Sequence, residues 1–119
     1  MAFVLSQSAS YSWPVSFDVP TDGGRHEPQT FDGQFKRLPQ SRLGPIVAEL
    51  QQIEDLADLD RITEIAKEIL IGWDGVTGDD GKEIPYSEKA LSQLLEVPLL
   101  AVSIVKSYMD SIKGAKRKN

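Results

Sequence analysis

Non-polar and polar residues alternate in two stretches near the start of the chain. A period of two places every second side chain on one face of a β-strand. A turn sequence, Thr21-Asp22-Gly23-Gly24, separates the stretches, and glycine supplies the positive φ that tight turns require. Pro14 has no N–H to donate, so the first strand needs an open edge or a bulge. The pattern predicts a long β-hairpin with one largely aromatic face, formed by Trp13, Val15, Phe17, Val19, Phe31, Gly33 and Phe35.

The spacing of non-polar residues changes to three and four from residue 40 onwards, which is typical of helices with one buried face. The first predicted helix ends near Asp55. The second begins at Asp58 and carries its non-polar stripe as far as Trp73. Glycines around Trp73, beginning with Gly72, are expected to end this helix.

Two further helices are expected in the last third of the chain. Ser87 can cap a short helix, Pro98 breaks the chain after it, and a final helix runs to near Gly114. The final helix is non-polar over more than half of its circumference. We therefore expect it to be the central helix of a bundle, or to place part of its surface against another protein.

These patterns predict an α+β fold, with an N-terminal antiparallel β-hairpin followed by a small bundle of about four helices. We assign residues 1–38 to an N-terminal segment and the hairpin, and residues 39–113 to the helical domain. Residues 114–119 form a short basic tail, which we predict to be disordered. A chain of 119 residues is long enough to bury a core without cross-links.

Charge and composition exclude several kinds of protein. Residues 1–112 hold 18 acidic and nine basic residues, a net charge of −9, so nucleic acid is not expected as a partner. The chain has no cysteine, which excludes disulfides and thiolate sites. Its longest non-polar run, from Val97 to Val105, is too short to span a membrane. We also expect no signal peptide, because Met1–Leu5 has no basic region and little non-polar length. We expect a soluble protein that stays in the cytoplasm, with no membrane partner.

Candidate chemistry is sparse. His26 is the single histidine and follows a Gly-Gly turn, so a Ser-His-acid arrangement has little support. We predict no catalytic residue, no metal ligand and no cofactor, and hence a protein that is not an enzyme. A small metal-binding protein is the second alternative, although the loop fits no EF-hand register. That loop, residues 74–83, carries Asp74, Asp79, Asp80 and Glu83.

Two sets of residues are candidates for partner contact. An acidic ridge follows the i, i+4 spacing of one helix, where like charges cost about 0.2–0.5 kcal/mol per pair. The ridge is either a solvated face or a surface for a basic partner, and its members are Asp60, Glu64 and Glu68. The non-polar candidates are Trp13, Phe17, Phe31, Phe35, Leu100, Val105 and Met109. An open strand edge in the hairpin would also allow a homo-oligomer.

Five short segments resemble those of phage tail assembly chaperones from long, flexible-tailed phages and prophages. The aromatic hairpin ends in Phe35-Lys36-Arg37-Leu38-Pro39, and Ile71-Gly72-Trp73 ends the second helix. Asp80-Gly81 then leads to Ile84-Pro85-Tyr86-Ser87, and Leu94-Leu95 and Pro98 precede the final helix. The resemblance covers approximately residues 11 to 112.

The resemblance implies a small, acidic, non-catalytic protein of the host cytoplasm during virion assembly. Such a chaperone binds the tape measure protein, a long hydrophobic helical chain, and keeps it soluble. It helps tail tube protein subunits to polymerise around that chain and leaves before the tail is complete. In related phages a frameshift gives an extended form, and this chain would correspond to the short form. A minor structural protein of the phage tail is the first alternative.

Overall fold

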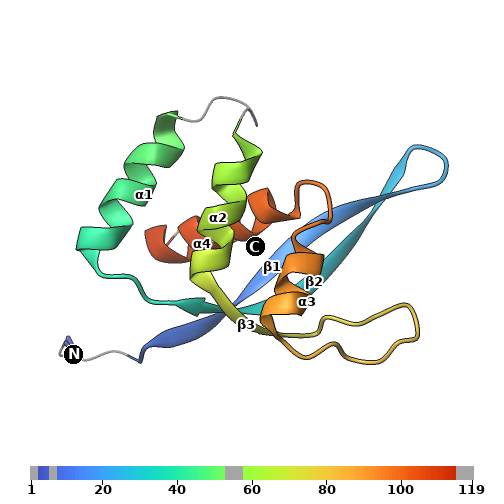
Figure 1. Ribbon diagram of the computed structural model, residues 1–119, viewed down its shortest axis with the longest axis horizontal. Coiled ribbons are helices and arrows are strands. Elements are labelled where there is room, and N and C mark those ends of the chain that lie inside the picture. The colour runs from blue at the N-terminus through green and yellow to red at the C-terminus, as the bar shows by residue number, and fades with distance from the viewer. Residues whose placement is uncertain (1–2, 6–7, 53–57, 115–119) are drawn as a thin grey trace.

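The fold combines one three-stranded sheet with four helices (Figure 1). The computed structural model describes residues 3–5, 8–52 and 58–114, with extents of 49 × 35 × 33 Å. The predicted α+β fold, with a hairpin first and four helices after it, is confirmed. In chain order the elements are β1 (Ser10–Thr21), β2 (Arg25–Lys36), α1 (Gln40–Gln52), α2 (Leu59–Ile69), β3 (Leu70–Asp74), α3 (Glu88–Leu94) and α4 (Leu100–Lys113).

The hairpin of β1 and β2 pairs without interruption from Ser10 opposite Lys36 to Thr21 opposite Arg25. Gly23 closes it with a φ of 84°, a conformation that few other residues adopt. The strand order β1-β2-β3 leaves β1 at an edge of the sheet, as the proline at position 14 requires. The predicted faces are also confirmed: Val15 and Phe35 are fully buried, while the polar residues that alternate with them are largely exposed.

The segment after α2 is a strand, which corrects the predicted helix up to Trp73. Helix α2 ends at Ile69, and β3 pairs antiparallel with β2, placing Leu70 opposite Phe35 and Trp73 opposite Gly33. Backbone hydrogen bonds to the free edge of β2 favour a strand here, although the spacing of the non-polar residues suits a helix. Trp73 is buried as expected, but it is held in a sheet rather than on a helix.

The predicted ends of the other helices largely agree with the structure. The Asp58 carboxylate accepts a hydrogen bond from the N–H of Arg61, and the Ser87 hydroxyl accepts one from the N–H of Ala90. Gly114 follows α4 in the left-handed conformation, with a φ of 62°. The predicted end of the first helix near Asp55 and the basic tail beyond Gly114 lie outside the described residues.

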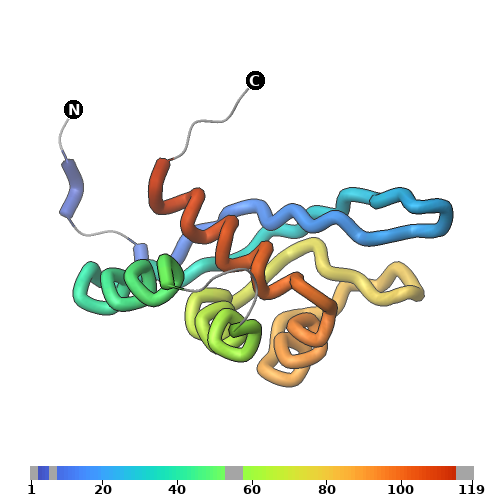
Figure 2. Tube along the Cα trace, turned by 90° about the horizontal axis from the view of Figure 1, so that it is seen from above, coloured from blue at the N-terminus to red at the C-terminus, as the bar shows by residue number. Residues whose placement is uncertain are grey.

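Helix α4 is the central element of the fold. It packs against α2 on one side and β1 on the other, as Figure 2 shows from above. The core contains no polar or charged residue among the described part of the chain. Its members come from every strand and helix: Val15, Phe35, Ile46, Ile62, Ile65, Ala66, Ile69, Leu70, Trp73, Ala90, Leu91, Leu100, Ala101, Ile104, Val105 and Tyr108.

Candidate functional site: a groove between β1 and α4

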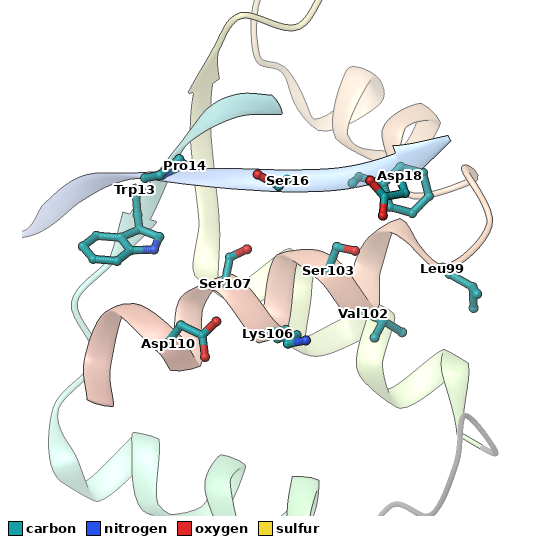
Figure 3. Close-up of a pocket in the computed structure, with 11 residues that line it drawn as sticks. Trp13, Pro14, Ser16, Asp18, Leu99, Val102, Ser103, Lys106, Ser107 and Asp110 are labelled. Atoms are coloured by element: carbon teal, nitrogen blue, oxygen red, sulfur yellow. The ribbon is translucent and has the colours of Figure 1, made fainter. Parts of the chain in front are cut away.

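A groove of about 630 Å³ lies between the outer edge of β1 and helix α4. This volume is within the range of about 300–1,000 Å³ that ligand pockets occupy. Figure 3 shows Trp13 directed from β1 toward α4, and Ser103 and Ser107 directed from α4 toward β1. The lining residues are Trp13, Pro14, Ser16, Phe17, Asp18, Leu99, Val102, Ser103, Lys106, Ser107 and Asp110.

The β1 wall combines both faces of the strand. Trp13 and Phe17 belong to the inward set of alternating residues and are half-buried, whereas Pro14, Ser16 and Asp18 belong to the outward set and are exposed. Residues of both sets reach one groove only because β1 is an edge strand. The groove therefore includes the strand edge itself, together with the two aromatic side chains beneath it.

The α4 wall is the face of the helix that the core does not cover. Val102 and Ser103 are half-buried there, while the following residue, Ile104, is fully buried on the opposite side. The two elements run in opposite directions, so Trp13 lies near Asp110 and Asp18 lies near Leu99 (Figure 3). From Leu99 to Asp110 the helix rises by about 16 Å, which sets the length of the groove.

Leu99 holds an unusual backbone conformation at one end of this groove. Its φ is 66°, and it is the only described residue other than glycine with a positive φ. The left-handed conformation costs a branched residue such as leucine about 1–2 kcal/mol. Leu99 precedes α4 without a side-chain cap, and its side chain is 47 % exposed. Leu99 therefore combines a strained backbone with an exposed non-polar side chain at one end of the groove.

Charged side chains mark both ends of the groove. Asp18 lies at the end near Leu99 and Asp110 at the end near Trp13, with Lys106 between them on α4 (Figure 3). Within the described residues, no ion pair joins any of these three side chains to another group. Both carboxylates are therefore available to a cationic group from outside the chain.

A cluster of aromatic residues fixes the geometry at the Asp110 end. The Tyr108 hydroxyl donates a hydrogen bond to the carbonyl oxygen of Lys36 at 2.9 Å, and the Tyr11 and Ser111 hydroxyls lie 2.6 Å apart. The Phe35 ring packs 5.3 Å from the Tyr108 ring. Burial raises the pKa of Tyr108 to about 12, and the nearby Tyr11 adds to the shift. These contacts hold α4 at a defined distance from the hairpin.

Three of the predicted contact residues are core residues, which corrects the sequence-based assignment. Phe35 has no exposed surface, and Leu100 and Val105 are each 5 % exposed. Leu100 and Val105 lie on the face of α4 that the core covers, because that face packs against α2. None of these three side chains can meet a partner while the protein is folded.

The other non-polar candidates have intermediate positions. Trp13 and Phe17 line the groove. Phe31 and Met109 are half-buried and pack against the core outside the groove. The structure therefore brings two of the seven candidates, both from β1, to a common surface.

The acidic ridge on α2 is partly occupied by ion pairs. Glu68 receives two hydrogen bonds from the Arg42 guanidinium, at 2.6 and 2.5 Å, and Arg61 bonds both Glu49 and Glu64. The Arg42 guanidinium holds the pKa of Glu68 below its ordinary value of 4.5. Two of the ridge residues thus pair within the chain, while Asp60 is exposed. The Arg42–Glu68 and Arg61–Glu49 pairs connect α1 to α2, whereas the Arg61–Glu64 pair lies within α2.

The acidic loop after β3 is closed by its own hydrogen bonds. The Trp73 indole donates to the carbonyl oxygen of Ile84 at 2.7 Å, and the Ile84 N–H donates to that of Val76 at 2.8 Å. One Asp80 carboxylate oxygen accepts from the N–H of Lys82. Across residues 3–5, 8–52 and 58–114, no three or more His, Asp or Glu side chains lie close enough together to hold a metal ion.

The residues that complete the groove carry no distinctive signal in the sequence. Leu99 and Val102 appear in the sequence as ordinary members of a non-polar helix, and Asp18 and Asp110 as isolated charges. The excess of non-polar residues around the final helix was the available signal. This excess alone does not show which face of the final helix is covered and which is open, because that depends on the position of β1.

Comparison with known proteins identifies the family. No helix in the described residues is both long and non-polar enough to cross a membrane. A family model described as YdaY prophage protein matches residues 38–116, more than half of the chain. The match shows that the protein is of prophage origin. The chain belongs to the YdaY prophage protein family. No curated protein and no solved structure matches it.

The family match and the groove overlap only in part. The matched residues contain α1 to α4 and β3, whereas β1 and β2 precede them. The α4 wall of the groove therefore lies within the family match, and the β1 wall lies before it. Strand β3 links the two parts, because it belongs to the match and pairs with β2.

Proposed function

We propose that this prophage protein is a tail assembly chaperone that binds the tape measure protein, keeps it soluble and promotes assembly of the tail tube. The observation that carries the proposal is the groove between β1 and α4. It offers Trp13, Phe17, Leu99 and Val102 as non-polar contact surface on a folded protein. Exposed non-polar surface of this kind is typical of sites that bind another protein.

Prophage origin and net charge add support. Family membership places the gene among phage genes, where a tail assembly factor belongs. The net charge of −9 over residues 1–112 favours solubility of a complex that contains a hydrophobic client. The role requires binding and release and no chemical step, so we propose that the protein is not an enzyme and acts in the host cytoplasm.

Co-expression tests this function. The tape measure protein of the same prophage is produced alone, with this protein, and with an unrelated acidic protein of similar size. The proposal predicts that the tape measure protein is soluble and co-purifies only with this protein. If it stays insoluble in all three cultures, the chaperone function is contradicted.

Analysis of finished particles separates a chaperone from a minor structural protein of the tail. A chaperone leaves before the tail is complete, so mass spectrometry of purified tails should detect no stoichiometric amount of this protein. A constant number of copies in each tail would instead identify a structural subunit.

A further inference from the structure

We infer that the β1–α4 groove binds a short amphipathic helix that carries cationic residues, and that the bound segment does not add as a strand to β1. This inference rests on the proposed function and refines it, since it assigns the binding site and the form of the bound client segment. Three observations carry it: the distribution of prolines on the edge of β1, the length of the groove, and the positions of its charges.

The pairing of β1 with β2 determines which backbone groups face the open edge. In antiparallel strands, opposite residues alternate between pairs that exchange two hydrogen bonds and pairs that exchange none. Pro14 is opposite Asp32, Asp18 is opposite Pro28, and Pro20 is opposite His26. Because proline has no N–H, these pairs belong to the second kind. The backbone groups of the even-numbered β1 residues therefore point away from β2, toward the open edge.

Prolines occupy two of these outward positions and weaken the edge as a template for another strand. Pro14 and Pro20 offer no donor, so only Ser16 and Asp18 present outward N–H groups between them. Prolines on an edge strand commonly protect it against strand addition. A client strand in this position would find only two backbone donors beside the outward carbonyl groups, so it would form fewer hydrogen bonds than at an edge without proline.

The dimensions of the groove fit a helix. The distance of about 16 Å along α4 between Leu99 and Asp110 corresponds to three helical turns. A helix of this length places non-polar side chains at i, i+3 or i+4, and i+7 on one face. Trp13 and Phe17 on β1 and Val102 on α4 contribute non-polar lining along the same length. Binding of an amphipathic helix in such a groove is a common mode of peptide recognition.

Charge determines which amphipathic helix is favoured. Asp18 and Asp110 lie at opposite ends of the groove, and neither pairs with another described side chain. A client helix with Lys or Arg near either end would neutralise them, and Lys106 lies between them, one helical turn before Asp110 (Figure 3). Complementary charges at the rim of an interface increase the association rate and fix orientation.

Leu99 adds a non-polar contact surface at a position where the backbone conformation is unfavourable for leucine. A leucine in the left-handed conformation is strained, and strain of this kind commonly marks functional positions. Asparagine tolerates that conformation better than leucine does, so Leu99→Asn should leave the protein at least as stable. Ile112→Asn is the matched control, because Ile112 is on the same helix, 39 % exposed, and outside the groove.

The experiment uses the full chain and overlapping peptides of the tape measure protein, each about 20 residues long and able to form several helical turns. We expect one or more peptides to bind and to become helical, as observed by circular dichroism and by NMR of labelled peptide. Leu99→Asn and Val102→Gln should each weaken binding about tenfold, the range of an interface residue with a large contribution. Ile112→Asn should bind like the wild type, and Leu99→Asn should not lower the melting temperature.

A second set of variants tests the same site without altering its core. Asp18→Asn is exposed on the hairpin, and it should reduce binding at low salt more than at high salt. Asp60→Asn, on the acidic ridge of α2, should leave binding unchanged. Pro14→Ser restores an outward N–H, and it should give no gain in affinity for a helical client.

The outcomes separate failure of this inference from failure of the proposed function. If the wild type keeps the tape measure protein soluble and binds its peptides, but Leu99→Asn and Ile112→Asn bind equally well, the groove assignment is overturned and the chaperone function stands. An extended bound peptide, or tighter binding by Pro14→Ser, also overturns the inference. If the wild type neither binds any peptide nor keeps the full-length client soluble, both proposals are overturned.

Discussion

The two faces of α4 differ both in composition and in environment. The covered face packs against α2 and the sheet, and its members are Leu100, Ala101, Ile104, Val105 and Tyr108, none more than 6 % exposed. The open face, together with the residue that precedes the helix, lines the groove with Leu99, Val102, Ser103, Lys106, Ser107 and Asp110. The difference arises because the sheet and α2 cover only one side of the helix.

This difference shows how one helix can serve stability and binding separately. Side chains on the covered face remove non-polar surface from water on folding, so they stabilise the protein directly. Side chains on the open face remain partly in water until a partner covers them. Substitutions on the covered face should therefore lower stability, and substitutions on the open face should weaken binding.

The largest effect is expected from a charge on the covered face. Ile104 has no exposed surface, so Ile104→Asp would bury an unpaired carboxylate and should unfold the protein, at a cost above about 4 kcal/mol. Ser103→Asp, one residue earlier and on the open face, should lower the free energy of unfolding by less than about 1 kcal/mol. Urea unfolding measures both variants. Equal losses of stability would show that the two faces do not differ.

Ionisation of the Tyr108 hydroxyl, on the covered face of α4, should make the stability of the protein depend on pH in the alkaline range. The pKa of Tyr108 is raised from 10.0 to about 12 by burial, so the folded state favours the neutral phenol. The associated stability is complete below pH 10 and is lost as the pH rises through about 12. Tyr108→Phe should remove this pH dependence and cost about 1 kcal/mol at neutral pH for the hydrogen bond to Lys36. Thermal unfolding at pH 7 and pH 11 measures both effects.

A smaller effect is expected from the ion pairs between α1 and α2, which lie away from both faces of α4. Arg42 and Arg61 hold the pKa values of Glu68 and Glu49 below their ordinary value of 4.5. Their contribution is therefore present above pH 4.5 and is lost as the pH falls through the lower folded-state values. Glu68→Gln should slightly lower the urea midpoint at pH 7, and this difference should shrink as the pH falls further below 4.5. A midpoint unchanged at pH 7 would show that the pair adds no stability.

The smallest effect on stability is expected at Leu99. Leu99→Gly removes the strain of the left-handed conformation but increases the freedom of the unfolded chain. The two terms oppose each other, so the melting temperature should change little, while the groove loses a 47 % exposed non-polar side chain. Differential scanning calorimetry measures this change. A clear destabilisation would show that Leu99 is a structural residue and not a contact residue.

Much of the fold could be predicted because local patterns and local structure agree. The alternation around Val15 and the Gly-Gly turn predict the hairpin, and the caps at Asp58 and Ser87 mark where helices begin. Strand β3 could not be predicted in this way. The spacing from Ile69 to Trp73 suits a helix, and only the free edge of β2, far away in the sequence, makes a strand more favourable.

The groove could be predicted only in part. Trp13 and Phe17 were identified from the alternation in β1, and both line the groove. Val105 is a candidate contact residue in the sequence but is only 5 % exposed in the structure. A helix with non-polar residues over more than half of its circumference has no unique inner side that the sequence could reveal. The positions of α2 and β1 around α4 decide which face is covered. Those positions depend on tertiary packing, and the spacing of non-polar residues along the sequence carries no information about it.

Hydrogen–deuterium exchange of the purified complex with the tape measure protein tests the groove most directly. Exchange is compared between the free and the bound protein at each amide. If the groove binds the client, exchange should be slower in the bound protein at Ser16 and Asp18 of β1 and along the segment from Leu99 to Asp110, with little change in α1, α2 or the loop after β3. Slower exchange confined to the acidic ridge of α2 or to β3, with none along β1 and α4, would contradict binding in the groove.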